Sequence, residues 1–194
     1  MKENPTPDKK MRILEAAVKV FSEKGFHEAK MERIAEVADV GKGTVYEYFK
    51  SKEELFVEMF KAGSEYYMRK IKDEINIACC AEEKLFKVME IHFSFMRDHR
   101  DLARLIMQEH QQTGKYMQEW GHSQHQEKVK LLTAIINEGI EKKEFKASNP
   151  NVTAALIFGM VASMGGMFIF SPEPPKVEDI IASIKEILTG GLIQ

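Results

Sequence analysis

Residues 30–52 read KMERIAEVADVGKGTVYEYFKSK, and this stretch decides the fold of the N-terminal part of the chain. Two short helical runs, around 31–38 and from Lys42 to about Phe49, flank a turn at 39–41. Apolar residues lie where two such helices must pack on each other and on a preceding helix. They are Ile34, Ala35, Ala38, Val40, Val45 and Phe49. The pattern predicts a helix-turn-helix, a unit whose second helix enters the major groove of DNA.

The outer face of the second helix carries groups that suit DNA. Along this helix and its exit lie Lys42, Thr44, Tyr46, Tyr48, Lys50 and Lys52. Ammonium and hydroxyl groups bind phosphate oxygens, which position a helix without reading sequence. Lys42 at the helix start reaches guanine O6 or N7, and Gly43 permits a close approach of the backbone. We therefore expect this face to contact DNA.

The run GKGTVYEYFKSKEEL, residues 41–55, resembles the signature of the TetR family (TetR/AcrR) of transcriptional regulators. The resemblance extends over about residues 8–56. It implies DNA contacts by Lys30, Lys42, Gly43, Thr44, Tyr46, Glu47, Tyr48 and Lys52. By position in the family's motif, Lys42, Gly43 and Thr44 contact bases or nearby backbone. Tyr46, Tyr48 and Lys52 bind phosphates.

Some positions depart from the family's pattern or allow two interpretations. Asp39 stands where the turn commonly has glycine, Gly41 where a serine commonly begins the helix, and Lys30 where threonine is common. Aspartate tolerates the left-handed conformation second best, and Lys30 still approaches a phosphate. Glu47 either accepts a hydrogen bond from cytosine N4 or is a solvated charge. The departures affect the expected operator sequence and leave the motif in place.

Beyond the motif, the chain of 194 residues indicates an all-α fold of about nine helices. No proline occurs from Asp8 to Asn149, and proline is costly inside helices. Thr6 and Pro7 predict the start of the first helix, and Gly25 predicts its end. Further helices are expected at about 81–98, 100–111, 114–142, 150–170 and 176–189. We divide the chain into a DNA-binding domain, 1–52, and a helical effector-binding and dimerisation domain, 53–194.

The larger domain is rich in methionine, which fills irregular cavities and also ordinary cores. Of twelve methionines in the chain, eight lie beyond residue 60. With the aromatic residues nearby they predict an apolar pocket between helices. The candidate pocket residues are Phe86, Met89, Phe93, Met96, Met107, Met117, Trp120, Met160 and Met164. The expected effector is a small hydrophobic molecule, either a fatty acyl compound or an aromatic or drug-like compound.

Residues 152–170 form a run of 19 residues without a charge, which is long enough to span a membrane. Small residues recur at every fourth position, and such spacing lets helices approach closely. We favour a buried core or dimer-interface helix over a membrane span. The last two helices are expected to form a four-helix bundle with those of a second subunit. The candidate interface residues are Ala155, Gly159, Ser163, Ile180 and Ile184.

Two polar clusters allow other functions. Arg97, Arg100 and Arg104 crowd a predicted helix junction, where they meet an anionic head group or pair with Asp98 and Asp101.

Glu119, His122 and His125 have the spacing of metal ligands on one helix face, although a solvated polar face is the favoured interpretation. A helical enzyme or metal carrier would use these groups. No Gly-rich phosphate loop or nucleophile elbow occurs, so we expect no enzyme activity, cofactor or metal.

The adjacent cysteines Cys79 and Cys80 make a poor disulfide and indicate a reduced, cytoplasmic protein. The hypothesis from the sequence is a homodimeric regulator, a repressor in most members of the family. Two recognition helices would enter successive major grooves of a pseudo-palindromic operator, about 34–36 Å apart. The effector would shift the protein to a conformation that no longer fits this spacing.

Overall fold

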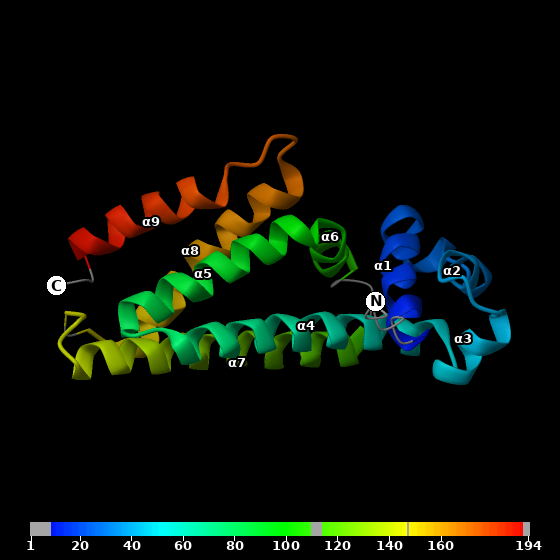
Figure 1. Cartoon of the computed structure of the whole chain (residues 1–194), viewed down its shortest axis with the longest axis horizontal. Coiled ribbons are helices and arrows are strands. Elements are labelled where there is room, and N and C mark those ends of the chain that lie inside the picture. Colours follow the sequence, from blue (N-terminus) through cyan, green and yellow to red (C-terminus); the bar gives the residue numbers. More distant parts are fainter. Residues whose placement is uncertain (1–8, 110–113, 147, 192–194) are drawn as a thin grey trace, which may run out of the picture. The chain divides into compact units, whose positions relative to one another are not determined.

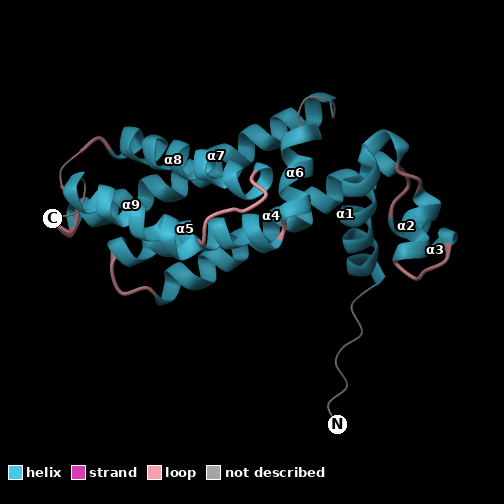
Figure 2. Cartoon of the chain, turned by 90° about the horizontal axis from the view of Figure 1, so that it is seen from above, coloured by secondary structure: helices cyan, strands magenta, loops and turns pink. Residues whose placement is uncertain are grey.

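The structure, a computed structural model, describes residues 9–109, 114–146 and 148–191, without the side chains of 106–109 and 114–118. This part of the chain forms nine helices joined by loops (Figures 1 and 2). They are α1 Lys9–Glu28, α2 Met31–Val37, α3 Lys42–Tyr48, α4 Lys52–Ile77, α5 Ala81–Asp98, α6 Arg100–Glu109, α7 Gly114–Glu141, α8 Pro150–Phe170 and α9 Val177–Gly191. The predicted all-α fold with about nine helices is confirmed.

Helix ends follow the local sequence signals. Gly25, which was predicted to end the first helix, has φ 73° and interrupts the helical geometry of α1, and the helix resumes after it up to Glu28. The Asn149 side chain accepts hydrogen bonds from the first amides of α8, and Pro150 follows at the first helical position. The predicted start of α1 at Thr6 and Pro7 lies outside the described residues.

The first compact unit comprises residues 1–65 and 101–113. Its core is aromatic: the Phe21 and Phe56 rings meet edge to face at 5.0 Å, and Phe56 and Phe60 meet at 4.8 Å. Leu55 is fully buried beside them. The first turns of α4 therefore complete the core of this unit, which continues to residue 65. The division at residues 52 and 53 remains a prediction about function.

The second unit comprises residues 66–100 and 114–194. In it, α5 packs against α7, α8 and α9, and α7 packs against α8 (Figure 1). Leu85, Met89 and Phe93 of α5 are completely buried at the centre of this unit, together with Ile136 of α7. Each of these helices therefore buries one apolar stripe, which is the usual way in which a helical layer is stabilised.

Helix α8 is long and apolar enough to cross a membrane by length and composition, but 33% of its most apolar window is buried within the chain. One stripe, with Ala154, Ile157 and Phe168, enters the core of the second unit. The opposite stripe is open, and Leu156 is 68% exposed. Helix α8 is therefore apolar on all sides but buried on only one. Its exposed stripe is apolar surface that the rest of the chain does not cover.

Candidate nucleic-acid interface and ligand cavity

The turn between α2 and α3 is closed by a side chain from α1. Asp39 has φ 51°, the left-handed conformation that the motif requires at this position. Nη2 of Arg12 donates to the carbonyl oxygens of Ala38 and Asp39 at 2.6 and 2.8 Å, and to the Asp39 carboxylate at 3.1 Å. A cation on the last carbonyls of a helix is favourable, because these oxygens have no partner within the helix. Arg12 therefore links α1, α2 and the turn.

Helix α3 has one buried face and one open face. Val45 is fully buried, and Phe49 directly after the helix is 1% exposed, so these two residues anchor it. Tyr46 and Tyr48 are 42% and 39% exposed. A Cβ on Gly43 would meet nothing within 4 Å, so the backbone is accessible there. The other predicted contact residues Lys30, Lys42 and Glu47 are also exposed, and Thr44 is half-buried.

Lys42, which the sequence assigns to the DNA, pairs with a carboxylate of the same chain. Its Nζ lies 2.5 Å from Oε1 of Glu32 on α2. The hydrogen bond with Glu32 raises the pKa of Lys42, and the same bond lowers the pKa of Glu32. Both side chains remain about half exposed, so a DNA phosphate has to compete with this carboxylate for the ammonium.

Lys52 is braced against the end of α1. Its Nζ donates to the carbonyl oxygens of His27 at 2.8 Å and Ala29 at 3.0 Å, and it lies 4.9 Å from the centre of the Phe26 ring. Its side chain therefore joins α1 to α4, and its phosphate contact stays a prediction.

The start of α4 forms a capping box, as the order of Ser51 and Glu54 three residues later indicates. The Glu54 amide donates to Oγ of Ser51 at 3.1 Å, and the Glu54 carboxylate accepts from the Lys50 amide at 2.6 Å. The position of Lys52 at the first residue of this helix follows from the box.

The second unit contains a cavity of about 420 Å³, including its open side. The walls are mainly apolar and come from α4, α5, α7 and α8. The lining residues are Tyr67, Ile71, Val88, Met89, His92, Lys128, Leu131, Leu132, Phe158, Val161 and Ala162. An apolar cavity with a few polar groups is the usual form of a small-molecule site.

Three polar side chains lie in this wall. The Tyr67 hydroxyl and His92 Nδ1 share a hydrogen bond of 3.2 Å. Nζ of Lys128 lies 4.9 Å from the centre of the Tyr67 ring. Burial raises the pKa of Tyr67 and lowers the pKa of Lys128. Burial, with a smaller contribution from the charge of Lys128, lowers the pKa of His92 to about 3. His92 is therefore neutral at pH 7.

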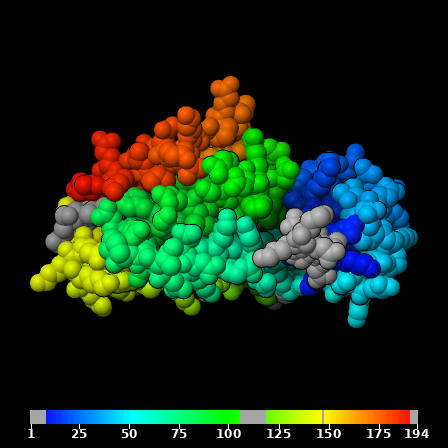
Figure 3. All heavy atoms as spheres, viewed as in Figure 1, coloured from blue at the N-terminus to red at the C-terminus, as the bar shows by residue number. Residues whose placement is uncertain are grey.

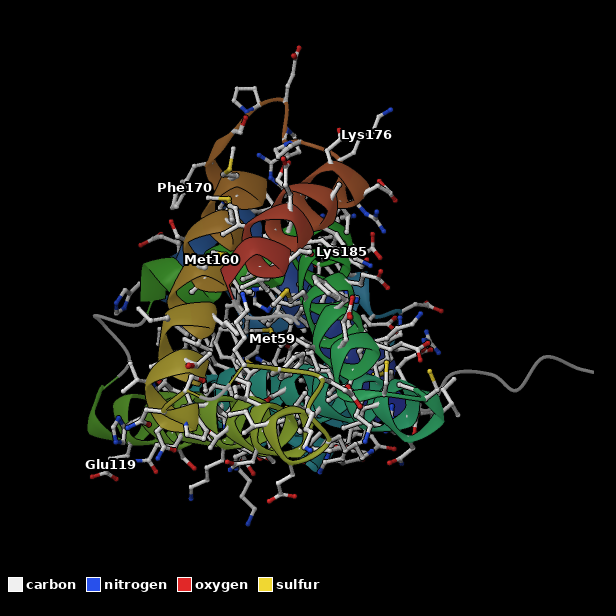
Figure 4. The ribbon with its side chains drawn as sticks, turned by 90° about the vertical axis from the view of Figure 1, so that its left-hand side faces the viewer. Met59, Glu119, Met160, Phe170, Lys176 and Lys185 are labelled. Carbon is white, nitrogen blue, oxygen red and sulfur yellow. The ribbon has the colours of Figure 1, made fainter. Side chains whose placement is uncertain are left out.

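Met107 belongs to the first unit, and the other predicted pocket residues are distributed over the second unit, where Met89 is the one that lines this cavity. Phe93 is fully buried in the core, while Met96, Met160 and Met164 are partly buried against it. The ring of Phe86 lies 5.3 Å from Nζ of Lys185, which Figure 4 labels on α9. Trp120 is half-buried. The side chains of Met107 and Met117 lie outside the described residues.

No sequence pattern identified Tyr67, His92 or Lys128 as site residues. Polar residues scattered over three helices have no local pattern, so sequence spacing gave no signal for them. A histidine within an apolar stretch of α5 was the one local hint.

The open stripe of α8 holds the small residues that the sequence assigned to a dimer interface. Ala155, Gly159 and Ser163 are all exposed. Phe170, 66% exposed, extends this stripe at the end of the helix (Figure 4). Figure 3 shows the outer faces of α9 and of the loop before it as one continuous surface.

The two isoleucines that the sequence assigned to the dimer interface are buried within their own chain. Ile180 and Ile184 are 7% and 3% exposed, because they face the core of their own chain. The exposed isoleucine of α9 is Ile187, at 63%. Helical periodicity identified an apolar stripe of α9, but it could not say which neighbour the stripe packs against.

The arginines of the predicted cluster have partners within the chain. Nε of Arg97 donates to the Asp98 carboxylate at 2.8 Å. Nη2 of Arg100 donates to the carbonyl oxygens of Ile169 and Ser171 at 3.1 and 2.8 Å, which holds the end of α8.

The face of α7 that carries Glu119, His122 and His125 is exposed to solvent, which is the interpretation favoured from the sequence. Glu119 points outward (Figure 4), His122 contacts Gln126, and the His125 ring lies edge-on to Phe158. Among the described side chains, the group close enough to share a metal ion is Cys79, Cys80 and Glu83. It is held together by hydrogen bonds at the start of α5, where the Cys79 amide donates to the Glu83 carboxylate.

Comparison with known proteins identifies relatives for both parts of the chain. Residues 13–59 match the family described as "Bacterial regulatory proteins, tetR family", and residues 79–165 match "Tetracyclin repressor-like, C-terminal domain". The chain is 28% identical over 185 residues, 95% of each chain, to the fatty acid metabolism regulator protein of Bacillus subtilis (strain 168).

Solved structures agree over nearly the whole chain. The transcriptional regulator FadR from Bacillus subtilis, in complex with stearoyl-CoA, superposes with a TM-score of 0.81 at 27% identity, covering 93% of this chain and 98% of that one. The fatty acid degradation regulator FadR from Bacillus halodurans gives a TM-score of 0.81 at 26% identity, with the same coverage.

The geometry of the turn generates a stability prediction. Arg12→Met removes the donor to two backbone carbonyls, and we expect the free energy of unfolding to fall by about 1–2 kcal/mol. Urea denaturation followed by circular dichroism measures this change. The matched control is Arg33→Met, because Arg33 forms an exposed pair with Glu36 and should change stability by less than about 0.5 kcal/mol. Equal effects of the two substitutions would contradict the role given to Arg12.

Proposed function

Because the chain belongs to the TetR family of bacterial transcriptional regulators, we propose that it is a cytoplasmic repressor that a fatty acyl effector releases from its operator. The family match places it among DNA-binding regulators and not among enzymes. The acyl effector, repression and dimerisation are the parts that we propose. The observation that carries the proposal is the apolar cavity in a chain that resembles an acyl-CoA-bound regulator over 93% of its length.

Contact with DNA is assigned to the open face of α3. Tyr46 and Tyr48 offer hydroxyl groups to phosphates, and the exposed backbone at Gly43 allows a close approach to a base edge. Lys42 exchanges its pairing with Glu32 for a phosphate or a guanine. Because its ammonium is held by two carbonyls, Lys52 contributes mainly by fixing α1 to α4 and only secondarily as a phosphate ligand.

The effector is assigned to the cavity of the second unit. Ile71, Leu132 and Val161 present aliphatic surface from three different helices, which suits a flexible hydrocarbon chain. FadR from Bacillus subtilis has been crystallised with stearoyl-CoA, whose acyl group is such a chain. Helix α4 contributes Leu55 to the core of the first unit and Tyr67 to the cavity wall. We assign to α4 the conformational difference between the DNA-binding and released states, which the effector must bind with different affinities.

Dimerisation is assigned to the open stripe of α8. Val152, Leu156 and Phe170 are each more than half exposed, and contiguous apolar surface of this kind is typical of an interaction site. The small residues between them let a second helix approach closely. Two copies of this stripe facing each other would form a symmetric interface, which fits a pseudo-palindromic operator.

The DNA assignment predicts the effect of removing one exposed tyrosine. Tyr46→Ala should weaken operator binding by about ten-fold or more, because a phosphate contact is lost, while helicity and assembly stay unchanged. The probe is a DNA duplex selected from a random pool by the wild-type protein, and fluorescence anisotropy measures its affinity. Tyr66→Ala is the control, since Tyr66 is similarly exposed at 37% on the later part of α4. Unchanged affinity in Tyr46→Ala would overturn the interface.

The dimer assignment predicts the effect of filling the small-residue stripe. Gly159→Leu should weaken self-association by about ten-fold or more, because a leucine there keeps two helices apart. A Cβ at Gly159 meets nothing within 4 Å, so the isolated subunit accommodates the side chain. Sedimentation velocity over a dilution series is the measurement, with the exposed Lys72→Leu as control. A monomeric wild type would refute this assignment.

The effector assignment predicts release from DNA by long acyl chains. Palmitate or palmitoyl-CoA, added below its micelle concentration, should lower the DNA affinity of the wild type by about five-fold to 150-fold, the usual range of coupling between two sites. The same anisotropy titration measures this shift. Butyrate and coenzyme A alone are the controls, since neither fills an apolar cavity. If neither long-chain compound changes DNA binding, the proposed effector class is wrong.

A further inference from the structure

The cavity contains an ammonium group that has no counter-ion. Lys128 lines the wall beside aliphatic residues, and its Nζ lies 4.9 Å from the centre of the Tyr67 ring. In the described part of the chain, no carboxylate lies within 4 Å of its Nζ and no oxygen accepts a hydrogen bond from it. The neighbouring Glu127 is exposed. Lys128 is half-buried, and a cation held at an apolar wall without a counter-ion is less well solvated than on an open surface, so its place in the wall favours an anionic ligand.

A second polar atom in the same wall also lacks a partner. Nε2 of His92 is buried and makes no hydrogen bond, while Nδ1 is occupied by the Tyr67 hydroxyl. If the hydroxyl donates to Nδ1, the neutral ring carries its proton on Nε2, which then is a donor. The protein leaves few buried polar atoms unsatisfied, so an orphan donor in a cavity wall points to a ligand acceptor. Lys128 of α7 and His92 of α5 both line this cavity, and Nε2 of His92 lies close to Gly165 of α8, where an added Cβ would be 3.2 Å from it.

The surrounding wall limits what the acceptor can be. The remaining lining residues are aliphatic or aromatic, and Lys128 is the one cation among them. A diphosphate or a nucleotide requires several donors and cations, which this wall does not offer. A single carboxylate at the end of an apolar chain matches one ammonium and one imidazole donor. A thioester carbonyl is neutral and would leave the ammonium without a counter-ion.

We propose that the cavity binds a free long-chain fatty acid through its carboxylate, with Lys128 as counter-ion and His92 as second donor. This inference rests on the proposed fatty acyl effector and names its head group. Tyr67 is a positioning residue, because its hydroxyl holds the His92 ring and sets which nitrogen carries the proton. The hydrocarbon chain lies against the aliphatic wall formed by residues such as Ile71 and Leu132.

The test measures direct binding of three ligands with the same chain length: palmitate, 1-hexadecanol and palmitoyl-CoA. Isothermal titration calorimetry of the full chain, below the micelle concentration of each ligand, gives the affinities. The wild type should bind palmitate about ten-fold or more tightly than 1-hexadecanol. Lys128→Met should remove this preference by weakening palmitate binding about ten-fold, while hexadecanol binding changes less than about two-fold. Lys130→Met, at an exposed position of the same helix, should behave as the wild type.

Tyr67→Phe tests the positioning role and guards against misfolding of the lysine variant. It keeps the ring beneath Lys128 and removes the hydroxyl, so palmitate should lose affinity while hexadecanol keeps it. Palmitate binding that is unchanged in Lys128→Met, or a wild type that binds palmitoyl-CoA and hexadecanol but not palmitate, would overturn the head-group assignment alone. A wild type that binds none of the three ligands would instead overturn the fatty acyl effector.

Discussion

The hydrogen bonds from Arg12 to the end of α2 are the constraint on which the DNA-facing geometry depends. The turn must bring α3 across α2 within the four residues 38–41, which forces Asp39 into a conformation that glycine adopts more easily. The guanidinium offsets this cost, because it satisfies the last carbonyls of α2 and the Asp39 carboxylate at once. Once the turn is held, Val45 and Phe49 are buried and the tyrosines of α3 face outward.

The cavity also carries a free-energy cost, but no group of the chain itself offsets it. In this apolar wall Lys128 has no counter-ion and Nε2 of His92 has no hydrogen-bond partner, which lowers the stability of the second unit. Such violations of ordinary core design are typical of functional sites, where the missing partner is supplied by a ligand. Binding of that ligand would stabilise the unit, and this gain is what can be coupled to release from DNA.

Helix α8 has one stripe that stabilises the chain and another that costs free energy in a single subunit. Its buried stripe stabilises the chain by contacts with α5 and α7, and Ile157 and Phe168 are almost fully buried. Its open stripe costs free energy in a single subunit, because Leu156 and Phe170 remain in water. A helix that is apolar on all sides is stable in water only when every side is covered, and the proposed second subunit covers the remaining stripe.

The helices, the capping box and the helix-turn-helix were predictable from the sequence, because each depends on residues within a few positions of one another. Ser51 with Glu54 and Asn149 with Pro150 mark the starts of α4 and α8 by local geometry alone, and Gly25 marks the break within α1. The spacing in residues 41–55 was likewise sufficient to indicate the DNA-binding motif.

Only the tertiary structure decided three features: the position of the cavity, the burial of Ile180 and Ile184 in their own chain, and the contacts of Arg12. Each depends on which faces of distant helices meet: Arg12 reaches a turn 27 positions away, and Tyr67 bonds to His92 across 25 positions. Helical periodicity shows whether a residue belongs to an apolar or a polar stripe, but it does not show which helix that stripe packs against. The sequence by itself therefore determined the class of protein and its DNA-facing helix, whereas packing decided where a ligand can bind.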